Sequence, residues 1–106
     1  MQIAGSKKFS VTHTHATAAK AEQAATAEKR HYITDIAGSS DKAGSIILVT
    51  EDSGGASEVV RYQITVGVGN FHHSFDTPLI ITVATKVSVE IDGTASCKAN
   101  IGGFTV

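Results

Sequence analysis

The sequence predicts an all-β protein, an antiparallel β-sandwich of roughly eight strands with jelly-roll-like connectivity and an extended N-terminal arm. Three observations favour this class. Short segments alternate apolar and polar residues, turn-forming residues separate them, and no segment carries the apolar stripe by which a helix docks on a core. The chain has 106 residues, 42% of them hydrophobic and 18% charged, which is the size and composition of one folded domain.

The clearest strand lies between residues 59 and 68, where apolar side chains occupy alternate positions. Such alternation puts one face of a strand against a core. Residues 45–50 contain a continuous apolar run, which predicts a strand covered on both faces. The period of two recurs in three further sets of inward residues: Leu79, Ile81 and Val83; Val87, Val89 and Ile91; and Ala95, Cys97, Ala99 and Ile101.

Turn residues separate these strands at residues 38–41, 52–55, 69–70, 76–78 and 92–93. The glycine, asparagine, aspartate and proline residues found there tolerate positive φ or preset a bend. Short strands divided at this spacing indicate an antiparallel sandwich or barrel. Near the C-terminus, a bulge at Gly102-Gly103 is expected to turn Phe104 inward, in phase with Ile101.

The N-terminal segment differs from the remainder of the chain. Residues 9–15 read as a strand with Phe9, Val11, His13 and His15 on one side. Residues 16–30 are rich in alanine and contain no larger apolar side chain, so a helix there would have no face to pack on a core. An extended arm and a short helical turn both stay open. We therefore divide the chain into a strand and arm at residues 1–29 and a sandwich at residues 30–106.

The histidines raise the question of a metal site. His13 and His15 are spaced so that a strand would put both imidazoles on one face, as in several β-barrel metalloenzymes. A third ligand is missing: Glu22 lies seven residues beyond His15, and the adjacent His72 and His73 point to opposite faces of a strand. The sequence therefore predicts no metal site and no cofactor, and it favours histidines on a polar surface or an interface.

No catalytic residues are expected either. The single cysteine, Cys97, lies on the inward face of its strand, where a thiol is desolvated and unreactive. The carboxylates Asp41, Glu51 and Asp52 fall at glycine-rich turns, and no glycine-rich phosphate-binding loop is present. We therefore expect a protein that is not an enzyme.

Charge and hydropathy narrow the possible partners. The net charge of −1 provides no strongly basic face for nucleic acid. No apolar run is long enough for a secretory signal or a bilayer span. Neither nucleic acid nor a membrane is an expected partner, and synthesis in the cytoplasm is expected.

One combination of segments resembles the small β-sandwich virion proteins of tailed bacteriophages. It consists of the Ala/Thr-rich arm running into Glu28-Lys29-Arg30-His31-Tyr32-Ile33-Thr34-Asp35-Ile36, the strand at 46–49, Thr77-Pro78-Leu79-Ile80 and Asn100-Ile101-Gly102-Gly103-Phe104. The resemblance covers residues 16–106. It implies a capsid decoration, or cement, protein that binds the major capsid protein on the head lattice and is made in the bacterial host's cytoplasm.

Oligomerisation is expected on physical grounds as well, because a small sandwich has edge strands that a neighbouring subunit can cover. A capsid-bound trimer is the favoured assembly. Two other functions stay open: a carbohydrate- or receptor-binding module of a tail fibre or spike, and a cupin-like metal enzyme. The residues expected to contact partners are Phe9, Val11, His13, His15, Lys29, Arg30 and His31.

Overall fold

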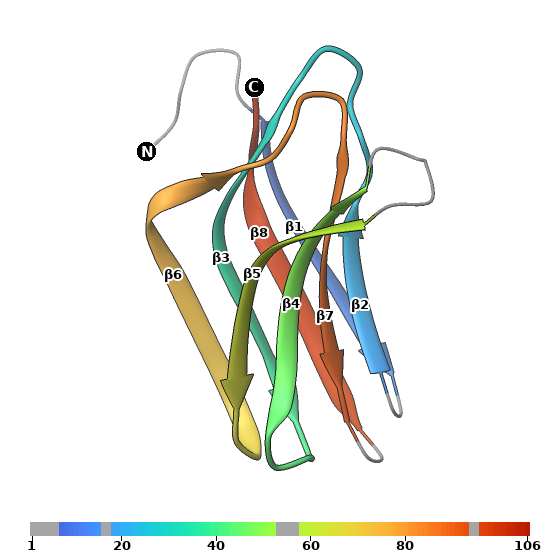
Figure 1. The fold of residues 1–106 in the computed structure, drawn as a ribbon, viewed down its shortest axis with the longest axis vertical. Helices are drawn as coiled ribbons and strands as arrows, with labels where there is room; N and C mark the ends of the chain where they lie inside the picture. Colours follow the sequence, from blue (N-terminus) through green and yellow to red (C-terminus); the bar gives the residue numbers. More distant parts are fainter. Residues whose placement is uncertain (1–6, 16–17, 53–57, 94–95) are drawn as a thin grey trace.

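The computed structural model describes residues 7–15, 18–52, 58–93 and 96–106, and it confirms an all-β sandwich. Sheet A has the strand order β1-β8-β3-β6 and sheet B the order β2-β7-β4-β5, with every pair antiparallel (Figure 1). The strands are β1 (Lys7–His15), β2 (Ala18–Gln23), β3 (His31–Ser40), β4 (Ser45–Asp52), β5 (Glu58–Val66), β6 (Gly69–Ile80), β7 (Lys86–Asp92) and β8 (Cys97–Thr105).

The connectivity is that of a jelly roll. The pairs β1–β8, β2–β7, β3–β6 and β4–β5 are nested one inside another along the sequence, as in a long hairpin folded over on itself. Consecutive strands lie in opposite sheets within each half of this hairpin, β1 to β4 and β5 to β8, and β4 pairs with β5 in sheet B where the two halves meet. The predicted jelly-roll arrangement is therefore confirmed.

The core lies between the sheets and consists mainly of isoleucine and valine. The predicted inward residues of β7 are buried, as are Cys97, Ala99 and Ile101 of β8. Two predictions are corrected. In β4, Ile47 and Val49 are buried but Ile46 is 44% exposed, because only one face of this strand meets the other sheet. The strand predicted around Leu79 ends at Ile80, so Val83 lies in the following loop and is exposed.

The prediction of an extended arm is wrong for residues 18–23, which form β2 of sheet B and pair with β7. Ala19 and Ala21 are only 1% exposed and belong to the core. The strand docks because its backbone hydrogen bonds are made with β7, and because β2 also lies against β1 and β8, where small side chains fill the space. Residues 7–15 likewise form an integral strand, paired with β8.

The bulge predicted at Gly102-Gly103 is corrected as well, because the irregularity lies in β3, between Ile33 and Asp35. β8 keeps its alternation to the end, so Thr105 is buried and Phe104 points outward, where it stacks on Tyr32 at 5.0 Å. A bulge can be placed on either of two paired strands, and the sequence of one strand does not decide which.

Candidate functional site

An open depression of about 780 Å³ lies on the outer side of sheet A. Residues of all four strands of the sheet line it: Lys8, Phe9, Ser10, Thr34, Asp35, Phe75, Asp76, Pro78, Gly102, Gly103 and Phe104. We refer to this surface as the outer depression. It lies where β3 and β6 lose register, because Ile33 pairs with Leu79 while Asp35 pairs with Ser74, so residues 75–78 face Thr34 alone.

Bare backbone forms part of the lining of the outer depression. A Cβ atom on Gly102 would lie 2.7 Å from Oδ1 of Asp35, and a Cβ atom on Gly103 would lie 2.0 Å from the carbonyl oxygen of Tyr32. Real Cβ atoms do not approach other atoms so closely. The two glycines are therefore needed for β3 and β8 to come together here with Asp35 above Gly102.

Asp35 is the best-positioned polar group of the outer depression. The Thr34 hydroxyl donates a hydrogen bond of 2.9 Å to its Oδ1 atom, and Nε2 of His72 lies 3.7 Å from its Oδ2 atom. The Asp35 side chain is 36% exposed, so its oxygens are held in place and still reach solvent. A carboxylate in this position can accept hydrogen bonds from the hydroxyl groups of a ligand.

Aromatic surface adjoins these polar groups. Phe104 lines the depression and stacks on Tyr32 with an interplanar angle of 5°. Phe75 lines the depression from β6 and contacts Tyr62 edge-on at 4.9 Å. The outer depression thus combines flat apolar surface with hydroxyl, carboxylate and ammonium groups, which is the mixed character of small-molecule and saccharide sites.

Of the residues predicted to contact partners, His31 is placed in the interior. It is 1% exposed, with Nδ1 2.7 Å from the Thr105 hydroxyl and Nε2 2.7 Å from the carbonyl oxygen of Ala24. Phe9 packs edge-on against its ring at 5.4 Å. His31 therefore joins three segments of the fold and presents no contact surface, which corrects its predicted role.

The remaining predicted residues separate into two groups. Phe9 and Lys29 line one cleft beside β1, described below, and Arg30 is exposed next to Lys29. Val11 is half-buried against the core. His13 and His15 share a face of β1, as predicted, and their exposed rings stack at 5.9 Å.

The histidine pair belongs to the contact between β1 and β2. Nδ1 of His13 accepts a hydrogen bond of 3.2 Å from the backbone N–H of Lys20, which lies on the edge strand of sheet B. Within the described residues, no three His, Cys, Asp or Glu side chains gather as a metal ion would require. Also among them, no helix is long and apolar enough to cross a bilayer.

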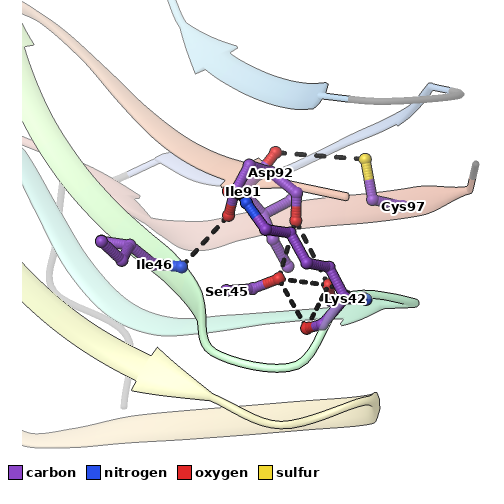
Figure 2. Close-up of polar contacts among 7 residues, drawn as sticks. Lys42, Ser45, Ile46, Ile91, Asp92 and Cys97 are labelled. Atoms are coloured by element: carbon purple, nitrogen blue, oxygen red, sulfur yellow. Dashed lines mark hydrogen bonds and ion pairs between the residues drawn. The ribbon is translucent and has the colours of Figure 1, made fainter. Parts of the chain in front are cut away.

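At the opposite end of the sandwich, a polar cluster connects the β3–β4 turn to the end of β7 (Figure 2). Asp92 accepts hydrogen bonds from the Lys42 ammonium at 2.6 Å and from the backbone N–H of Ile46 at 3.1 Å. The hydrogen bond from Lys42 holds the pKa of the Asp92 carboxyl below its usual value. Ser45 donates to the carbonyl oxygen of Asp92 at 2.9 Å, so the cluster fastens a turn.

Cys97 lies beside this cluster and is buried, as predicted. Burial, with a smaller contribution from the negative charge of Asp41, raises the pKa of its thiol. The thiol lies 3.5 Å from the carbonyl oxygen of His15, to which it donates. A protonated, enclosed thiol is a poor nucleophile, so Cys97 serves packing.

Sequence reasoning missed Asp35, His72 and Asp76 as site residues. Each stands on an outward position of β3 or β6, and a carboxylate on an outward position is ordinary in a strand. The available signal was the glycine pair at 102–103, which the sequence analysis interpreted as a bulge. A glycine inside a strand also marks a close approach of another backbone, and this second meaning applies here.

Comparison with known proteins gives a likeness of structure and none of sequence. No protein-family model matches the chain, and no curated protein sequence is similar to it. Among solved structures, the chain is similar to the carbohydrate-binding module TmCBM61, determined in complex with β-1,4-galactotriose, with a TM-score of 0.39 and 13% sequence identity. The alignment covers 93% of this chain and 68% of that one.

Proposed function

We propose that the chain is a non-enzymatic glycan-binding module, and that the outer depression of sheet A is its binding surface. The observation that carries the proposal is the placement of the Asp35 carboxylate over the bare backbone of Gly102, in a depression that the half-buried Phe104 also lines. A sugar ring presents hydroxyl groups at its rim and C–H groups on its faces. It therefore requires hydrogen-bond acceptors next to flat apolar surface.

The shape of the depression supports the same function. Its volume of about 780 Å³ is in the range of ligand sites, and it is open along the sheet. An open site on a flat sheet accepts an internal stretch of a polymer, whereas an enclosed cavity accepts only a small molecule or a chain end. Short oligosaccharides are therefore expected as ligands.

A second candidate function is the structural role in a phage particle that the sequence resemblance implies. The observation that favours it is an exposed apolar strip on β5, an edge strand of sheet B, where Val59 and Val60 are 52% and 51% exposed. An edge strand has unpaired backbone N–H and C=O groups, and a neighbouring chain can pair with them and cover the exposed apolar side chains. A trimer on the major capsid protein would bury such a strip.

The glycan proposal is tested by screening the full chain against an array of neutral and acidic oligosaccharides, followed by calorimetry with each ligand found. Asp35→Asn should weaken binding at least tenfold. The matched control is Glu90→Gln, a carboxylate-to-amide change on sheet B, which should bind like the wild type. Mass spectrometry of the recovered ligand should show an uncleaved, unmodified glycan.

Two results would contradict the proposal: an array on which nothing binds, or ligands whose affinity Asp35→Asn leaves unchanged. The structural role in a phage particle is tested by separate measurements. Sedimentation of the isolated protein gives its oligomeric state, and copy number in purified phage particles separates a head-lattice protein, present in hundreds of copies, from a tail component. Val60→Lys should abolish assembly if β5 is the covered edge.

A further inference from the structure

A second cleft, of about 280 Å³, opens at the end of the molecule where β1 begins and β8 ends. It is lined by Lys7, Lys8, Phe9, Gln23, Thr26, Lys29 and Thr105. We call it the basic cleft, because three of its lining side chains are ammonium groups and none of those described is a carboxylate. The sequence brings these lysines from two separate segments, the start of β1 and the connection between β2 and β3.

Among the described residues, no ion pair compensates the charges of the basic cleft. Lys20, Lys42, Arg61 and Lys86 each form ion pairs with carboxylates in this part of the chain, whereas no such pair includes Lys7, Lys8 or Lys29. Arg30 and Lys98 form none either, but Lys7, Lys8 and Lys29 line a single cleft, and a cleft focuses the field of such charges.

The position of Lys29 is fixed by backbone hydrogen bonds. Its N–H donates to the carbonyl oxygen of Thr26 at 3.1 Å, and its own carbonyl oxygen accepts from the N–H of Ala84 at 2.8 Å. Beneath the cleft, the buried His31 contacts Phe9 and Thr105, which both line it. The cleft is thus built on anchored backbone, from which three lysine side chains can reach an anion that enters it.

The basic cleft adjoins the outer depression at the edge strand β1, where Lys8 and Phe9 line both. A ligand that extends from the outer depression past β1 can therefore place its hydroxyl groups against Asp35 and an anionic substituent against Lys8 and Lys29. The acidic side chains of the outer depression, Asp35 and Asp76, do not line the basic cleft, so the two chemistries are spatially separated.

We infer that the glycan bound by this chain is acidic, and that the basic cleft holds its carboxylate or sulfate group. This inference rests on the proposed function, since it assigns the class of saccharide to the same surface. Lysine suits the task, because its ammonium group is a compact charge with three donors that can follow an anion of either geometry.

The test measures binding of two matched pairs of oligosaccharides by calorimetry at low and moderate salt. One pair is tetragalacturonate and its methyl ester, which removes the carboxylate charge, and the other is a sulfated galactotetraose and its desulfated form. The acidic member of one pair should bind at least tenfold more tightly than its neutral partner, and added salt should reduce this preference. The pair between which the protein discriminates shows whether the cleft holds a carboxylate or a sulfate group.

Two variants test whether the preference for the acidic oligosaccharide arises in the basic cleft. Lys29→Gln should reduce the preference for the acidic member by threefold or more while leaving the affinity for the neutral member unchanged. Lys98→Gln, at the end of β8 opposite Thr105, removes one exposed positive charge that does not line the cleft and should keep the wild-type preference. Both positions are solvent-accessible, and thermal melting checks that each variant folds.

The possible failures are distinguishable. Equal affinity for acidic and neutral members, or a preference that Lys29→Gln leaves intact, overturns this inference and leaves glycan binding standing. Absence of binding by all four oligosaccharides, together with an array on which nothing binds, overturns both. A preference that is lost in Lys29→Gln and kept in Lys98→Gln supports the inference.

Discussion

The carboxylate of Asp35 lies directly over the Cα of Gly102, so close that a methyl group on Gly102 would come within 2.7 Å of its Oδ1 atom. β3 and β8 are adjacent in sheet A. They fit together at this point because Gly102 of β8 has no side chain and Asp35 of β3 has a short acidic one. The geometry of the outer depression depends on this match.

Gly102→Ala should therefore displace Asp35 and impair the site. We expect a glycan affinity reduced at least tenfold and a loss of about 1–3 kcal/mol in the free energy of unfolding, typical of overpacking in a tight contact. Gly67→Ala is the control, because a Cβ atom there meets nothing within 4 Å. Calorimetry and urea unfolding measure the two effects, and unchanged binding by Gly102→Ala would count against the site.

His31 should prove to be a structural residue. His31→Ala removes a ring that contacts Thr105 and the carbonyl oxygen of Ala24, and it leaves the buried Thr105 hydroxyl and the partly buried carbonyl group without this partner. We expect a loss of about 2–4 kcal/mol in the free energy of unfolding, from the unpaired polar groups and the cavity. His72→Ala, with a side chain that is 61% exposed, should change stability by less than about 1 kcal/mol. Comparable stability of the two variants would refute this role.

The fold should lose stability in acid, and Glu51 should contribute to the loss. Burial by itself raises the pKa of Glu51, but hydrogen bonds from Thr82 and Arg61 outweigh it and hold the pKa below its usual value. A pKa that is lower in the folded state means that the stabilisation is present above the unfolded value, about 4.3, and disappears as the pH falls through the folded value.

Urea unfolding from pH 7 to pH 3 checks the contribution of Glu51. Glu51→Gln should be less stable than the wild type at pH 7. The difference should shrink as the pH falls below about 4.3 and should be lost below the folded-state pKa, where Glu51 is also neutral. Asp92, whose pKa is also lowered, provides a separate acid-sensitive contribution that this variant retains. A difference that stays constant over the range would show that Glu51 is not involved.

Residues 18–23 should behave as part of the core. Ala21→Asp places a charge in the position of a side chain that is 1% exposed, so we expect it to unfold the protein or to cost more than about 3 kcal/mol. Ala25→Asp, at an exposed position of the following loop, should be neutral. Circular dichroism and urea unfolding separate the two, and a stable Ala21→Asp variant would restore the detached arm.

Much of the fold can be predicted from the local alternation of apolar and polar residues. Where one face of a strand is wholly buried, as in β7, the period of two identifies every inward residue, because each misplaced side chain would expose apolar surface or bury a polar group. The prediction of an arm failed because only large apolar side chains were taken as a sign of burial. Ala19 and Ala21 are too small to signal a core position, yet they fill one beside β7.

The candidate site was beyond the reach of the sequence for a different reason. Asp35 and Gly102 are far apart along the chain and meet only because β3 and β8 pair in one register. Alternation assigns residues to faces but does not fix register between distant strands. Lys29 was recognised as a contact residue because it is charged and lies at a strand start, but its proximity to Lys7 and Lys8 depends on the same long-range pairing.

The nested connectivity also bears on the order in which the protein can fold as it is synthesised. β8 lies between β1 and β3, so one of the two inner strands of sheet A leaves the ribosome after the other seven described strands. Until then β1 and β3 have no common neighbour, and the groups that β8 will cover stay open to non-native pairing. Folding should therefore be slow and should occur after translation of β8, with nascent chains that lack it prone to aggregate.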